Sequence, residues 1–84
     1  MLVAGDISIS GDRILLRRAH SEGAWMYMRE QGQSVEEALL NNGSCDLILI
    51  HETQGESIAV DPSNSGFYTT SEGPHEPVYY YEFL

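Results

Sequence analysis

The sequence predicts an α+β fold: a small curved antiparallel β-sheet of about six short strands, with one short helix at about residues 35–42 packed on one face. Apolar and polar residues alternate in several short segments, which is the pattern of half-buried strands. One segment carries the start and stop signals of a helix. The connections are short and favour antiparallel neighbours, so the alternative is a small partly closed β-barrel with the same helix.

The first third of the chain predicts three consecutive strands joined by tight turns. Residues 2–9, 13–19 and 24–29 have extended patterns, and Ser, Gly and Asp residues separate them. In the first segment Ile7 and Ile9 fall on one face, which predicts a half-buried strand with these two side chains inside.

The helix is predicted from its capping residues. Ser34 and Glu37 have the spacing of a capping box, in which the serine side chain accepts from an early backbone N–H and the glutamate reaches back. Gly43 follows the last helical residues and suits the left-handed position after a helix. A helix this short needs a sheet to pack on. Its apolar stripe consists of Val35, Ala38 and Leu39.

The second half of the chain is expected to form further strands. The run Leu47–Ile50 is apolar without alternation, which predicts a central strand covered on both faces. Cys45, just before this run, is expected to be a small buried hydrophobe. Residues 62–66 contain Pro, Ser, Asn and Gly and predict a loop. The expected strands are residues 45–50, 57–61, 67–70 and 77–84.

Length and composition bound the organisation of the protein. The 84 residues make a single domain, residues 1–84, and a chain with 42% hydrophobic and 20% charged residues is expected to fold. Its longest apolar run is far shorter than the roughly 20 residues that span a bilayer. Asp6 interrupts the N-terminal segment where a signal peptide would be apolar, so a cytoplasmic location is expected. The single cysteine excludes an internal disulfide.

Charge is distributed unevenly along the chain. Thirteen acids face four arginines, there is no lysine, and the net charge is −9. All four arginines lie in residues 1–29, against three acids, whereas residues 30–84 carry ten acids and no base. Such a field repels nucleic acid and acidic membranes and attracts basic partners. The arginines, which we expect to pair with local acids, are Arg13, Arg17, Arg18 and Arg29.

No motif for catalysis, a cofactor or a metal stands out. The chain has no GxSxG, no GxGxxG and, without lysine, no GxxxxGK[ST] loop for phosphates. His20, His51 and His75 each have a glutamate nearby, but none belongs to a compact metal motif such as HExxH. We therefore expect a non-enzymatic protein with no cofactor and no metal.

The C-terminal segment and the acids around it predict the contact surface. Tyr79, Tyr81 and Phe83 fall on one face of a strand, and tyrosine supplies apolar area together with a polar tip. Carboxylates on the neighbouring turns and strands surround these rings with negative charge. The predicted partner-binding residues are Glu52, Glu56, Asp61, Glu72, Glu76, Tyr79, Tyr81 and Glu82.

Together these features predict an acidic binding protein, an inhibitor that docks on the basic nucleic-acid-binding surface of a partner complex. Its carboxylates would imitate a row of phosphates. In size and charge alone the chain is similar to small acidic phage proteins that disable CRISPR or restriction complexes. The expected partner is a basic protein or nucleoprotein complex, without direct contact to nucleic acid or membrane. The alternative is a homo-oligomeric structural or accessory domain, in its simplest form a homodimer, joined through the Tyr-rich C-terminal strand.

Overall fold

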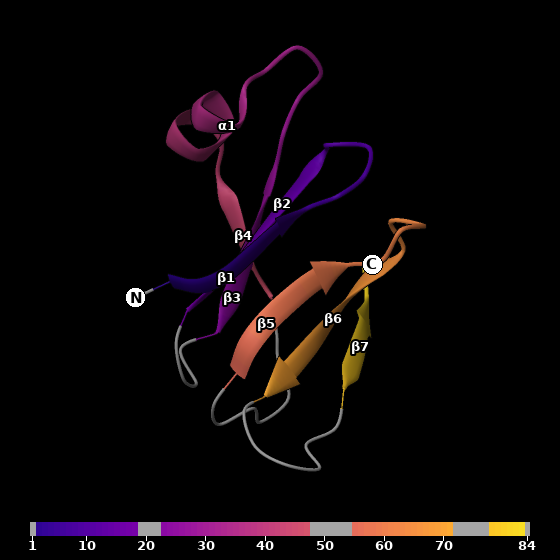
Figure 1. The fold of residues 1–84 in the computed structure, drawn as a ribbon. Coiled ribbons are helices and arrows are strands. Elements are labelled where there is room, and N and C mark those ends of the chain that lie inside the picture. Colours follow the sequence, from indigo (N-terminus) through magenta and orange to yellow (C-terminus); the bar gives the residue numbers. More distant parts are fainter. Residues whose placement is uncertain (1, 19–22, 48–54, 72–77, 84) are drawn as a thin grey trace.

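The structure, a computed structural model, describes residues 2–18, 23–47, 55–71 and 78–83. These residues are mostly strand with one short helix, which agrees with the predicted α+β class (Figure 1). The elements in chain order are β1 (Leu2–Ile7), β2 (Arg13–Arg18), β3 (Ala24–Met28), α1 (Val35–Asn41), β4 (Ser44–Leu47), β5 (Gly55–Val60), β6 (Gly66–Ser71) and β7 (Tyr79–Glu82).

The strands form two antiparallel sheets, so the prediction of a single sheet is wrong. One sheet has the order β1-β2-β3-β4 and the other the order β5-β6-β7. β5 does not extend the first sheet but lies against β1 and β2, and in this way the two sheets cover each other's apolar faces. Among the described strands no main-chain pairing joins the two sheets, so the barrel alternative is not formed either. Figure 1 shows the two sheets as separate layers.

β1 turns the opposite face inward from the one expected. Ile7 and Ile9 are 43% and 80% exposed, whereas Ser8 is buried. Asp6 is half-buried and its Oδ2 accepts a hydrogen bond of 2.8 Å from the backbone N–H of Val60 in β5. Alternation separates the two faces of a strand but does not say which is buried. Here the neighbouring strand supplies a donor that a polar side chain must satisfy.

β4 lies at the edge of its sheet and is not the central strand that its apolar run predicted. Among the described strands β4 pairs with β3 alone, and β2 occupies the other side of β3. The first three residues of β4 are exposed, and Cys45 is one of them, so the expected burial of this thiol is wrong. Leu47 does reach the core. The remainder of the apolar run, residues 48–50, lies outside the described residues.

The helix begins as predicted and ends differently. Ser34 Oγ accepts from the backbone N–H of Glu37 at 3.0 Å, and Glu37 Oε1 accepts from the N–H of Ser34 at 2.9 Å. The backbone of Asn42 is extended at the C-terminus (φ −91°, ψ 147°), and Gly43 is not left-handed, so that part of the prediction is wrong. Among the described elements α1 contacts β3, at one end of the first sheet (Figure 1). No helix in the described part of the chain is long and apolar enough to cross a bilayer.

Removing the cap should destabilise this end of the molecule. Ser34→Ala leaves one helical N–H without its acceptor, and we expect the free energy of unfolding to fall by about 1 kcal/mol. Urea unfolding followed by circular dichroism measures it. Ser44→Ala, at an exposed position of β4, is the matched control and should change stability by less than about 0.5 kcal/mol. Equal losses in the two variants would contradict a specific role of the cap.

The core lies between the two sheets. Its buried members come from both: Leu15 (0% exposed) and Ala24 (4%) from the first sheet, Ile58 (5%) and Phe67 (3%) from the second. Arg17, only 1% exposed, crosses the same interface, and its Nη1 donates to the carbonyl oxygen of Ser57 at 2.9 Å. Half-buried apolar residues pack around these buried residues: Ala4, Met26, Leu47, Val60, Tyr81 and Phe83.

Candidate functional site

The arginines are engaged with backbone carbonyls and aromatic rings. Arg29 donates from Nε to the carbonyl oxygen of Gly11 at 2.7 Å and from Nη1 to the carbonyl oxygen of Gln33. It therefore joins the turn after β1 to the segment before α1. Arg17 is buried in the core, as described above. These two cations contribute to the fold and present little charge to a partner.

The other two arginines lie on aromatic rings. The guanidinium carbon of Arg13 is 4.0 Å from the ring centroid of Phe83, and that of Arg18 is 4.9 Å from the centroid of Trp25. Neither of them, nor Arg29, forms an ion pair with a carboxylate in the described part of the chain. The expected pairing with local acids is therefore wrong for these three residues.

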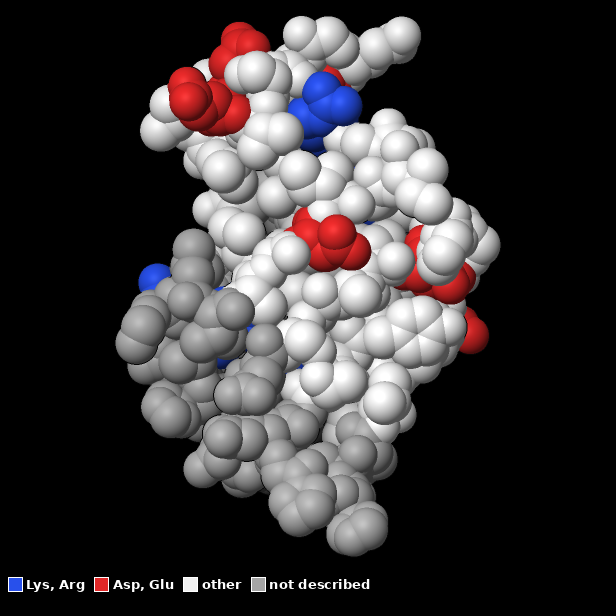
Figure 2. Space-filling view, in the orientation of Figure 1, with Lys and Arg blue, Asp and Glu red and all other residues white. Residues whose placement is uncertain are grey.

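Carboxylates occupy the surface. Figure 2 shows red acidic side chains at the end that carries α1, near the middle of this face and along its right side, whereas blue surface is confined to small areas. Arg17 is buried and Arg29 is bound to two backbone carbonyls, so these two cations offset little of the negative charge at the surface, whereas Arg18 is exposed. The exposed acids among the described residues are Glu30, Glu36, Glu37, Asp46 and Glu82.

The two faces of β7 differ as the alternation predicted. Tyr81 lies on the inner face, where its ring stacks on Phe67 at a centroid distance of 5.0 Å, and Tyr79 lies 6.4 Å from Tyr81 on the same face. On the outer face Tyr80 is 41% exposed and its ring lies 4.9 Å from that of Tyr68, which is 40% exposed. The exposed tyrosine pair is therefore Tyr68 and Tyr80.

A groove of about 460 Å³ runs between the edge strands β4 and β7. We name it the β4–β7 groove. Its volume lies in the range of ligand-binding clefts, about 300–1,000 Å³. Its uncharged lining residues are Met26, Cys45, Leu47, Phe67, Tyr81 and Phe83. Its charged groups are Arg13, Asp46 and Glu82.

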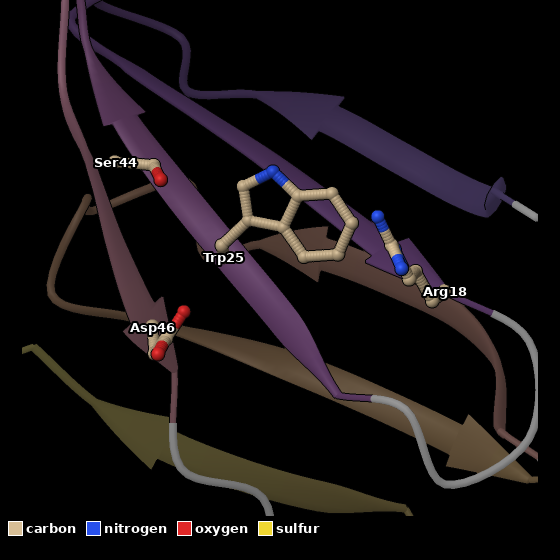
Figure 3. A pocket seen from close by; sticks show the side chains of 4 residues that line it. All are labelled: Arg18, Trp25, Ser44 and Asp46. Atoms are coloured by element: carbon tan, nitrogen blue, oxygen red, sulfur yellow. The ribbon is translucent and has the colours of Figure 1, made fainter.

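A second hollow of about 310 Å³ lies on the outer side of the first sheet. Figure 3 shows Arg18 beside Trp25, with Ser44 and Asp46 on β4 across from them. Register explains the arrangement, because Trp25 pairs with Asp46 in the β3–β4 ladder. The hollow presents one cation, one carboxylate and a single indole ring, so its charge favours neither sign of ligand.

A hydrogen-bond network joins the turn between β1 and β2 to the turn between β5 and β6. Asp12 Oδ1 accepts from Ser10 Oγ at 2.6 Å and from Ser8 Oγ at 2.7 Å. Asn64, which has a left-handed φ of 61°, donates from Nδ2 to the same atom at 3.1 Å. These three donors lower the pKa of Asp12 to about 2, with Ser10 the largest cause and Ser8 the next. Asp61 is also held ionised, because bonds from Ser63 and Ser65 lower its pKa.

The lowered pKa predicts how stability depends on pH. The carboxyl of Asp12 binds its proton less readily in the folded chain, so its contribution is present above the ordinary pKa of 3.8 and is lost as pH falls towards about 2. After allowance for solvent screening we expect about 1 kcal/mol. Urea unfolding at roughly pH 5 and pH 2 measures it, and Asp12→Asn should have a shallower pH dependence than the wild type. An unchanged slope would assign the acid sensitivity to other carboxylates.

The structure describes only part of the predicted contact surface. Asp61 lies in the turn after β5, Glu82 is exposed on β7, and Tyr79 and Tyr81 are half-buried on its inner face. The remaining predicted acids, Glu52, Glu72 and Glu76 together with the side chain of Glu56, lie outside the described residues, as do the histidines His20, His51 and His75. No cluster of three or more metal-ligating side chains occurs among the residues described.

Sequence reasoning did not identify the exposed residues that complete the surface. The predicted contact surface lacks Tyr68 and Tyr80, whose rings contact each other on the outer face, and Asp46, which borders the groove. The alternation in β7 contained the signal for Tyr80, but it did not say which face points outward. Nothing in the sequence signalled that β4 would be an edge strand opposite β7.

Comparison with protein-family models, curated proteins and solved structures gives no match.

Proposed function

We propose that the protein is an acidic docking protein that binds the basic, nucleic-acid-binding surface of a partner and inhibits it. One observation carries the proposal: Arg17 and Arg29 are bound to backbone carbonyls within the fold and Arg13 lies on a ring, whereas Glu30, Glu36, Glu37, Asp46 and Glu82 are exposed. An excess of exposed acids over exposed bases, in a chain of net charge −9, produces a long-range attraction for a basic surface. The proposal assigns no catalytic residue and no cofactor.

The electrostatic origin of the affinity has a direct test. The immobilised full chain is used to capture proteins from a bacterial lysate at low salt and at about 1 M salt, where charges are screened beyond about 3 Å. We expect an Arg- and Lys-rich nucleic-acid-binding partner that is released as salt rises. The purified partner should lose its own nucleic-acid binding when the protein is added. A partner retained equally at both salt concentrations would contradict the proposal.

Matched variants separate charge from shape. Glu30→Gln, Glu36→Gln and Glu82→Gln together remove three exposed charges, and the corresponding Glu→Asp triple variant keeps them. We expect the glutamine variant to bind the captured partner about tenfold more weakly, and the aspartate variant to bind like the wild type. Equal affinities for both variants would show that the acidity serves solubility.

A second candidate is a homo-oligomeric accessory domain, and the observation that favours it is the position of β7 at the end of its sheet. Two such edges can pair across a twofold axis. Repulsion between two chains of net charge −9 opposes this. Sedimentation at low and high salt distinguishes the candidates, because a dimer of like-charged chains should gain stability as salt screens the repulsion.

A further inference from the structure

We infer that the partner docks through an extended segment with alternating apolar and basic residues, which adds a strand to the free edge of β7 and places its apolar side chains in the β4–β7 groove. This inference rests on the proposed function and specifies how the acidic protein holds its partner. Three features support it: the main chain of β7, the two faces of the sheet beside that edge, and the charges around them.

The main chain of β7 has donors and acceptors on its open side. The backbone N–H of Phe83 donates to the carbonyl oxygen of Ser65 at 2.9 Å, and Tyr81 pairs with Phe67 two residues earlier. In an antiparallel pair such positions alternate, so the main-chain groups of Tyr80 and its neighbours at two-residue intervals point away from β6. The described residues form no main-chain hydrogen bond on that side. An extended peptide fits such an edge.

The inner face beside this edge accepts apolar side chains. Tyr81 and Phe83 on the β7 side and Leu47 on the β4 side form the walls of the groove, with Met26 and Phe67 deeper. A strand paired with β7 sends every second side chain to this face. Branched aliphatic side chains there would cover half-buried apolar surface that the fold leaves open on this side.

The outer face beside the same edge suits basic side chains. Glu82 is exposed there, and Tyr80 and Tyr68 present rings that are 41% and 40% exposed. A lysine or arginine on the added strand would lie beside the Glu82 carboxylate and the Tyr80 ring, which both attract cations. The two faces together therefore select a segment in which apolar and basic residues alternate.

Charge favours a basic partner over a second copy of this chain. Glu82 and Asp46, the two acids that border the groove from the outer faces of β7 and β4, form no ion pair in the described part of the chain, and Arg13 is already placed on the Phe83 ring. A second copy would bring another net charge of −9 and its own Glu82 to the same edge. A basic segment removes the repulsion that a copy would add.

The test uses the full chain and a synthetic peptide of alternating lysine and valine, about eight residues long. Titration followed by amide nuclear magnetic resonance should move the signals of Val78, Tyr80 and Glu82. A peptide of the same composition with the lysines and valines in separate blocks is the charge control, and we expect it to bind at least about tenfold more weakly. In the peptide, alternate backbone N–H groups would face β7 and the others would face away. Methylating the peptide nitrogens that face β7 should weaken binding similarly, and methylating the other set should not.

Protein variants complete the test. Glu82→Gln should lower the affinity for the alternating peptide more than Glu36→Gln does. The second variant removes the same charge from α1, away from the β7 edge. Equal binding of the alternating and blocked peptides would overturn strand addition and leave the acidic docking function standing. Failure of both peptides to bind would contradict the docking function as well. Self-association that moves the same β7 signals without peptide would assign the edge to a second copy.

Discussion

Replacing Phe67 with alanine should lower the free energy of unfolding by about 4 kcal/mol. The ring is 3% exposed, belongs to the core, stacks on Tyr81 at 5.0 Å and lies 5.7 Å from Phe83. Its removal leaves a cavity between the sheets and ends both ring contacts. A chain of this length has a total stability on the order of 5–10 kcal/mol, so the variant should be largely unfolded at modest urea concentrations. Urea unfolding monitored by tyrosine fluorescence and circular dichroism measures the loss.

The conservative variant tests the explanation. Phe67→Leu keeps most of the buried volume and loses the ring stacking, so we expect a loss of about 1–2 kcal/mol. Near-equal losses in the two variants would show that the stacking, and not the cavity, dominates. A wild-type stability for Phe67→Ala would contradict the placement of this ring in the core.

Gly66→Ala should destabilise the protein by about 3 kcal/mol through the opposite mechanism, since it adds an atom where there is no space. A Cβ at Gly66 would overlap the carbonyl oxygen of Tyr81 and lie 2.7 Å from the end of the Tyr80 ring. The ring can move, but the carbonyl belongs to the β6–β7 ladder and cannot move without disturbing the pairing.

Gly43→Ala is the control for this variant. A Cβ there would meet no atom within 4 Å, and the backbone is not left-handed, so the substitution should leave stability within about 0.5 kcal/mol of the wild type. Thermal unfolding of both variants gives the comparison. If Gly66→Ala were as stable as Gly43→Ala, the close approach of β7 to β6 at this point would be disproved.

Local signals in the sequence predicted local structure well. The capping box of Ser34 and Glu37 located the start of the helix, and the turn residues at 62–66 located the β5–β6 turn, because each acts through bonds to nearby backbone. The choice of buried face in β1 was not local. It depends on the bond from Val60 to Asp6, which joins residues far apart in the sequence.

The same distinction applies to the candidate site. The excess of acid in the second half of the chain was evident from counts, and the separation of Tyr80 from Tyr81 followed from alternation. The engagement of Arg29 with the Gly11 carbonyl was not evident, because it requires the tertiary fold to bring a turn and a loop together. The opposition of β4 and β7 also follows from how the two sheets stack, which no segment of the sequence encodes.

The hydrogen bonds between the side chains and backbone of the two sheets lie on one side of the molecule. Asp6 and Arg17 bind β5, and Asn64 binds the turn before β2, so these bonds all lie on the side where β5 meets the first sheet. The described residues form no such hydrogen bond between β4 and β7, where the layers are joined by the contact of Arg13 with the Phe83 ring and by apolar packing around the groove. Thermal motion of one sheet relative to the other should therefore be a hinge motion about the side where β5 is hydrogen-bonded to the first sheet. We expect the distance between β4 and β7 to fluctuate more than other distances between the described strands, and a bound strand to reduce that fluctuation.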